Sequence, residues 1–126
     1  MNEDLILFFT GHDKSLPIFY KLEEKIREFS PEVKIRIQKT QVSFSNKHGF
    51  AFVSFLPVRK AKDRPANYIT VSFGLPYRLV SPRIDAASEP YPNRWTHHVM
   101  ISLTDEIDEE LVEWLREAAA FSESKR

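Results

Sequence analysis

The spacing of hydrophobic residues predicts one amphipathic helix near each end of the chain. Before Pro31, apolar residues recur every three or four positions, which is typical of a helix of about four turns with one buried face. A similar pattern follows Thr104 and an acid-rich first turn, which suits a helix N-terminus. The two predicted buried stripes consist of Phe19, Leu22, Ile26 and Phe29, and of Ile107, Leu111, Trp114, Leu115, Ala118 and Phe121.

Between these helices, apolar and polar residues alternate, which predicts short β-strands. Residues 46–49 have the composition of a hairpin turn, so the strands on either side of them are expected to be antiparallel. The segment 50–55 is apolar on both faces, as in a central strand. The predicted strands cover residues 33–38, 41–45, 50–55, 68–73 and 96–103.

Three segments give a less regular pattern. Residues 5–9 are apolar but too few to distinguish a helical turn from a strand. Residues 74–95 hold four of the eight prolines, and irregular connections of this length are uncommon and often functional. We expect this segment to fold back across the sheet as an ordered flap, and we expect residues 122–126 to be a frayed tail.

The order of the elements predicts the α+β class. Helices and strands do not alternate, so a parallel doubly wound sheet is disfavoured. We expect a single domain over residues 1–126, with an antiparallel sheet of about five strands and the N- and C-terminal helices packed on one face. Strand alternation then places a polar and basic set on the other face, including Lys34, Arg36, Thr70, Ser72 and His98.

The composition excludes several kinds of site. The chain has 126 residues and no Cys, so it forms no disulfide and no Cys-ligated metal centre. Three Gly are too few for a phosphate loop or a dinucleotide fingerprint. It has no apolar run long enough to span a membrane, and its acidic first residues do not suit a signal peptide. We therefore expect a soluble cytoplasmic protein with no cofactor, no bound metal and no membrane partner.

The charge is segregated although the net charge is zero. Residues 33–99 hold eleven Lys and Arg and three Asp and Glu, a net charge of +8, whereas residues 1–32 carry −3 and residues 100–126 carry −5. One explanation is a basic face for an anionic partner. The other is that acidic helices neutralise a basic sheet within one small domain.

Three arginines in the irregular segment are the best candidates for binding an anion. Arg78, Arg83 and Arg94 have guanidinium groups, which suit phosphate and carboxylate. We expect at least two of them to converge with Lys39 or His98 on one concave patch. The alternative is that they pair with Asp85 or Glu89 and hold the loop in place.

The adjacent histidines suggest a structural role and a chemical one. His97 and His98 point to opposite faces of a strand, which disfavours a shared metal. We expect His97 to be buried and hydrogen-bonded. His98 is a candidate for ligand contact or, with Glu89, for acid–base chemistry.

Several motifs resemble a known bacterial family, the domain of unknown function numbered 5655. The resemblance covers nearly the whole chain, and residues 89–98 are its most specific part. It implies a small α+β domain, found alone or attached to other domains, and it implies no activity. The motifs are Lys39–Phe44, Ser72–Arg78, Ser81–Arg83 and Glu89–His98.

Three functional hypotheses follow. The first is a binding or accessory module for an anionic ligand or a nucleic-acid backbone. The second is a small enzyme that uses Glu89 and His98, although we assign no catalytic residue. The third is a homodimerisation or protein-interaction domain. The candidate ligand-binding residues are Lys39, Arg78, Arg83, Arg94, His98 and Glu89.

Overall fold

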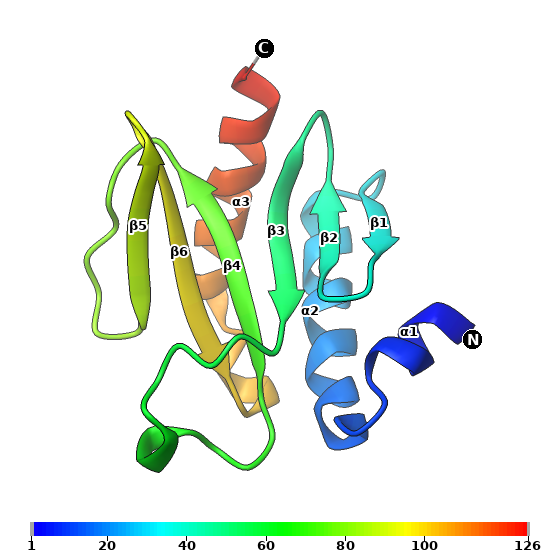
Figure 1. The fold of residues 1–126 in the computed structure, drawn as a ribbon. Coiled ribbons are helices and arrows are strands. Elements are labelled where there is room, and N and C mark those ends of the chain that lie inside the picture. Colours follow the sequence, from blue (N-terminus) through cyan, green and yellow to red (C-terminus); the bar gives the residue numbers. More distant parts are fainter. Residues whose placement is uncertain (1, 126) are drawn as a thin grey trace.

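The computed structural model describes residues 2–125, which form one antiparallel sheet and a helical layer (Figure 1). The strand order in the sheet is β1-β2-β3-β4-β6-β5. The helices are α1 (Glu3–Phe8), α2 (Leu16–Phe29) and α3 (Glu109–Ser124), with short 3-10 helices η1 (Asp13–Ser15), η2 (Ala61–Asp63) and η3 (Thr104–Glu106). The strands are β1 (Lys34–Ile37), β2 (Val42–Ser45), β3 (Gly49–Ser54), β4 (Ile69–Leu75), β5 (Ala86–Tyr91) and β6 (Arg94–Ile101).

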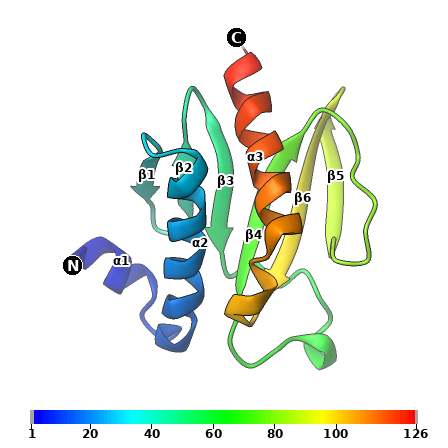
Figure 2. The same ribbon diagram turned by 180° about the vertical axis from the view of Figure 1, so that it is seen from behind.

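Helices α2 and α3 cover one face of the sheet, and the opposite face has no helix over it (Figures 1 and 2). The apolar stripes of both helices pack against inward-facing strand residues such as Phe44, Val71 and Val99. The α+β prediction is therefore confirmed. The two helices predicted near the ends of the chain, α2 and α3, lie on one side of an antiparallel sheet. The described part of the chain has six strands where about five were expected.

The additional strand is β5, which lies in the segment expected to be irregular. It pairs with β6 at one edge of the sheet. Residues 76–85 form the irregular connection before it, and this connection passes along the sheet edge rather than across the exposed face (Figures 1 and 2). The expectation of a flap over the sheet face is therefore wrong.

Side-chain caps explain where α1 and α3 begin. The Asn2 side chain accepts a hydrogen bond from Asp4 N at 2.9 Å and caps α1, so residues 5–8 belong to a helix and not to a strand. Asp108 accepts from Leu111 N at 3.1 Å and caps α3. The acid-rich stretch after Thr104 first forms η3, and α3 starts at Glu109.

The C-terminal end of α3 is anchored to the β2–β3 turn. Ser122 is almost fully buried, and its hydroxyl accepts from His48 N at 3.0 Å. Asn46 Nδ2 donates to Ala119 O at 2.9 Å. In place of the tail expected to fray from Ser122, the helix continues to Ser124, while residue 126 lies outside the described residues. None of the described helices has the length and hydrophobicity that crossing a membrane requires.

Candidate anion-binding face

We call the face of the sheet turned away from α2 and α3 the open sheet face. The strand register places five of its residues side by side across β1, β2, β3, β4 and β6. Arg36 pairs with Ser43, Ser43 with Phe52, Phe52 with Ser72, and Ser72 with His98. We call this set the central row. It runs from an exposed arginine at one edge, over an aromatic ring, to a histidine.

Phe52 presents a half-buried ring in the middle of the central row. The side chains on both sides of it, Ser43 and Ser72, are small, so they leave the ring face uncovered by bulky neighbours. Gly49 has a related role, because a Cβ atom there would lie 2.7 Å from the Phe52 ring. Small residues around one aromatic ring make a flat surface on which a planar group can stack.

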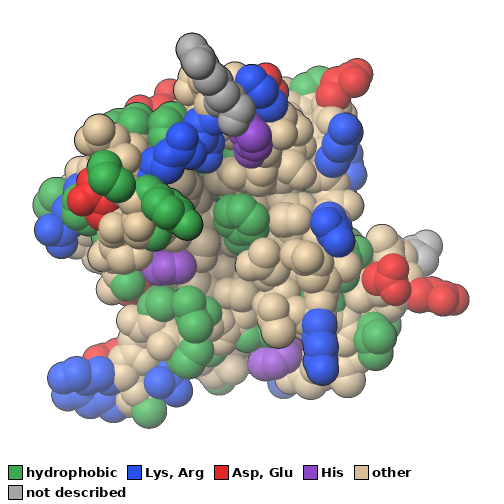
Figure 3. Space-filling model, turned by 45° about the horizontal axis from the view of Figure 1, so that its top comes forward, with side chains coloured by type: hydrophobic (Ala, Val, Ile, Leu, Met, Phe, Trp, Pro, Cys, Tyr) green, Lys and Arg blue, Asp and Glu red, His purple; other side chains and the backbone are tan. Residues whose placement is uncertain are grey.

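Basic side chains lie beside this surface. Lys34 and Arg36 are exposed on β1, on the same face as the central row. Arg94 is exposed at the start of β6. Burial lowers the pKa of Lys125, and the nearby positive charge of Arg94 lowers it further. Figure 3 looks obliquely onto this face and shows Lys and Arg side chains along its margins. An anion on the open sheet face would therefore meet positive charge on either side.

His98 forms a close polar contact inside the row. Its Nδ1 lies 2.6 Å from Ser72 Oγ, and burial lowers the pKa of His98. The ring is therefore neutral at pH 7 and acts as a polar aromatic group rather than as a cation.

His97 has the structural role expected of it. Its ring is fully buried on the helix side of the sheet and stacks on Phe73, with ring centroids 5.1 Å apart. Leu79 N donates to His97 Nε2 at 2.9 Å, so the histidine holds the connection after β4 against the sheet. Burial lowers the pKa of His97 and keeps this acceptor neutral.

One end of the open sheet face is covered by the loop of residues 55–67. The strand pattern predicted a connection here, but not that it would cover the face. Thr70 Oγ1 donates to Leu56 O at 2.6 Å, and both Thr70 and Met100 are buried. Thr70 was expected to be an exposed residue of the polar face, and this expectation is wrong because the loop covers it. The loop therefore covers this end of the face over β4 and β6, whereas Ser54 on β3 stays partly exposed.

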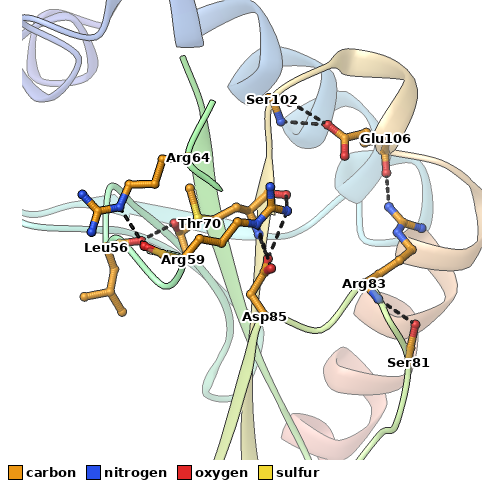
Figure 4. Close-up of polar contacts among 10 residues, drawn as sticks. Leu56, Arg59, Arg64, Thr70, Ser81, Arg83, Asp85, Ser102 and Glu106 are labelled. Carbon is orange, nitrogen blue, oxygen red and sulfur yellow. Dashed lines mark hydrogen bonds and ion pairs between the residues drawn. The ribbon is translucent and has the colours of Figure 1, made fainter. Parts of the chain in front are cut away.

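A partly buried ion pair holds this loop in place (Figure 4). Arg59 Nε donates to Asp85 Oδ1 at 2.8 Å, and Asp85 Oδ2 accepts from Met100 N at 2.8 Å. The hydrogen bond to Asp85 is the main cause that raises the pKa of Arg59. Asp85 was considered a partner for an arginine of its own segment, but its partner is Arg59, 26 residues earlier.

Arg83 is held by the acidic start of α3. Its Nη1 lies 2.8 Å from Asp108 and 3.0 Å from Glu110. Its Nη2 donates to Glu106 O at 2.5 Å, the contact that Figure 4 shows. The guanidinium also lies over the Trp114 ring, 5.7 Å from its centroid. Burial lowers the pKa of Arg83, but its hydrogen bonds with Asp108 and Glu110 outweigh this and raise it overall. Arg83 therefore connects the loop to the helical layer.

The other candidate residues are distributed over the molecule. Arg78 is exposed and stacks on Trp95 at 5.7 Å, and Arg94 lies at the opposite end of β6 from the covering loop. Glu89 is in the β5–β6 hairpin, where its carboxylate accepts from Asn93 N at 2.9 Å. Lys39 lies in the exposed β1–β2 turn, four strands from β6 in the sheet order.

The structure therefore does not gather the six candidate residues into one patch. Of these six, His98 alone belongs to the central row. Sequence reasoning did not single out Phe52 as a binding residue, because the apolar run of residues 50–55 suggested a strand buried on both faces. The signal that could have identified it was the serine content of the neighbouring strands.

Comparisons with known proteins indicate a family and no activity. Neither a curated protein nor a solved structure matches the chain. A family model described as Domain of unknown function (DUF5655) matches residues 7–122. These residues include all six strands, helix α2 and most of α3. The chain therefore belongs to the DUF5655 family.

Proposed function

We propose that this domain is a cytoplasmic binding module whose open sheet face holds a single-stranded nucleic acid. The observation that carries this proposal is the central row, in which a half-buried Phe52 lies between small serines and an exposed Arg36 lies at the edge. Single-strand binding proteins combine an aromatic surface for bases with positive charge for the backbone. Both components are present on one face here.

The dimensions of the row suit this ligand. Neighbouring strands lie about 4.8 Å apart, so Arg36 on β1 and Phe52 on β3 are separated by about 10 Å. A base stacked on Phe52 would therefore leave its backbone phosphates within reach of the long arginine side chain. The neutral ring of His98, two strands further on, offers a second polar aromatic contact.

The acid–base hypothesis receives less support from the geometry. The Glu89 carboxylate caps the β5–β6 turn, whereas the His98 ring contacts Ser72 on β4. His98 pairs with Ala86 in the sheet, three residues before Glu89 along β5. A proton-transfer pair would require the two side chains to face one substrate, and their present partners hold them apart.

A binding measurement with matched variants tests the proposal. The probe is a fluorescently labelled single-stranded DNA of about twelve nucleotides, and the readout is fluorescence anisotropy at several salt concentrations. Stacking on an aromatic side chain contributes about 1–3 kcal/mol per base, so we expect Phe52→Leu to weaken binding about tenfold. Arg36→Gln should weaken binding and reduce the salt slope by about 0.7.

The control is Arg27→Gln, because Arg27 is an exposed arginine on α2, on the other side of the molecule. This variant should bind like the wild type. The proposal fails if the wild type shows no binding at low salt up to about 100 µM, the weak end of ordinary non-specific affinity. A mass near twice 14.8 kDa by light scattering, lost in Phe52→Leu, would assign the face to homodimerisation instead.

A further inference from the structure

A cavity of about 530 Å³ lies at one end of the open sheet face, near the β1–β2 turn. Three segments far apart in the sequence form it: the end of α1 with the residues after it, the β1–β2 turn, and the end of β3. Its volume is within the usual range for sites that bind small molecules. Its lining residues are Phe8, Thr10, His12, Lys39, Thr40, Gln41, Ser54, Phe55 and Leu56.

Stacked rings form one wall of the cavity. His12 lies parallel to Phe55, with centroids 3.8 Å apart and an angle of 10° between the planes. Phe8 stacks on Phe55 from another direction, at 5.1 Å. Leu56 extends this apolar surface and is 48% exposed. An exposed imidazole already held parallel to an aromatic ring is a good surface for a further flat ring, such as a nucleobase.

The rest of the cavity lining is polar and carries positive charge. Lys39 is exposed in the turn, and Thr40 and Ser54 contribute hydroxyl groups. None of the nine described residues that line the cavity is acidic. An acid, Asp4, lines the neighbouring cavity, which shares Phe8 and Lys39 with this one. A phosphate here would therefore find an ammonium group and hydroxyl donors.

The cavity continues the surface of the central row. Ser54 follows Phe52 by two residues on β3, so both face the same side, about 7 Å apart along the strand. The loop of residues 55–67 closes the sheet face at this end, because Leu56 accepts the hydrogen bond from Thr70. A strand that runs along β3 over Phe52 would therefore reach the cavity and stop there.

We infer that this cavity binds the terminal nucleotide of a single strand, with its base against His12 and Phe55 and its terminal phosphate at Lys39. This inference rests on the proposed function of the open sheet face. A terminal phosphomonoester carries between one and two negative charges near pH 7, whereas a backbone phosphodiester carries one. A lysine at the cavity therefore favours a phosphorylated end over an internal position.

The test compares three DNA strands of one sequence that differ only at their ends. One carries a 5′-phosphate, one a 3′-phosphate, and one hydroxyl groups at both ends. We expect a phosphate at one of the two ends to lower the Kd about two- to fivefold, as an exposed ion pair would. Lys39→Gln should remove this gain, and His12→Ala should reduce it.

The matched control is Lys47→Gln, which removes an exposed lysine from the β2–β3 turn, the other hairpin turn next to β2. It should keep the full gain from the terminal phosphate. Lys39 and His12 are both exposed, so their variants are expected to fold, and melting temperatures verify this.

The two proposals fail in different ways. Equal Kd values for the three strands, unchanged in Lys39→Gln, would overturn end recognition and leave binding by the sheet face intact. Loss of the gain in Lys47→Gln as well would also overturn it, because the effect would then come from overall charge. Failure of all three strands to bind would overturn the proposed function and this inference with it.

Discussion

Replacing Arg83 tests whether the arginine of the irregular segment is structural. Its guanidinium makes two ion pairs, with Asp108 and Glu110, and lies over the Trp114 ring. Its side chain is 25% exposed while both carboxylates are about half exposed, so each pair contributes at most about 1 kcal/mol. The contact with the tryptophan adds about 0.5–1 kcal/mol. We therefore expect Arg83→Gln to lower the free energy of unfolding by about 1.5–2.5 kcal/mol.

Urea denaturation followed by tryptophan fluorescence measures this change. Arg78→Gln is the matched control, because Arg78 is an exposed arginine of the same segment whose ring contact is with Trp95. It should lose less than about 1 kcal/mol of the free energy of unfolding.

Acidification provides a second readout. Burial raises the pKa of Asp108, but its hydrogen bond with Arg83 and the helix amide of Leu111 outweigh this and lower it overall.

A lowered carboxyl pKa stabilises the fold above the unfolded-state value near 3.9, and this contribution is lost as the pH falls through the folded-state pKa. Arg83→Gln should therefore reduce the acid dependence of stability below about pH 5. Equal losses in Arg83→Gln and Arg78→Gln, or an unchanged acid dependence, would refute the structural role that we give to Arg83.

Three further changes test other parts of the structure. Trp114→Ala should destabilise the protein by about 3–5 kcal/mol in urea denaturation, because Trp114 is 7% exposed in the core, and a loss below about 1 kcal/mol would contradict this packing. Asp85→Ala should lower the free energy of unfolding by about 1.5–3 kcal/mol, because it removes the charged partner of Arg59. It should also accelerate tryptic cleavage in residues 57–67. Unchanged cleavage would mean that another contact holds the loop. Burial lowers the pKa of His97, so below about pH 6.5 the unfolded chain binds a proton that the folded chain does not, and stability should fall on acidification. His97→Gln should flatten this dependence below about pH 6.5, leaving the contribution of His98, whose pKa burial also lowers; an unchanged slope would exclude His97 as the cause.

Helices α2 and α3 and five of the six strands in the described part of the chain could be predicted because their burial leaves a periodic pattern in the sequence. Strand β5 could not. It lies at the sheet edge with one neighbouring strand, most of its residues are exposed, and it contains Pro90, so it has no alternation of apolar and polar residues. The end of α3 could not be predicted either. Its serines have the composition of a polar tail, and Ser122 is held by a contact with Asn46, which is distant in the sequence.

The candidate site was harder to predict than the fold, because the availability of a charge depends on contacts distant in sequence. Arg83 was expected to pair within its own segment if it paired at all. Its partners Asp108 and Glu110 lie 25 and 27 residues later, and the segment reaches them because it passes the sheet edge on the helix side. Periodicity describes which face a residue occupies, but it does not describe what folds over that face.

Neutralisation within the fold accounts for part of the charge segregation. Arg59 and Arg83 are neutralised inside the fold, by Asp85 and by the acidic start of α3. Within residues 2–125, no ion pair joins Lys34, Arg36 or Lys39 to an acid, and these bases lie on β1 and its turn. Among the described residues, Arg78 and Arg94 of the irregular segment make no ion pair either, so unpaired positive charge lies towards both edges of the sheet. The part of it on β1 and its turn lies near Phe52 and the cavity at Lys39, the two surfaces on which we propose that a single strand stacks.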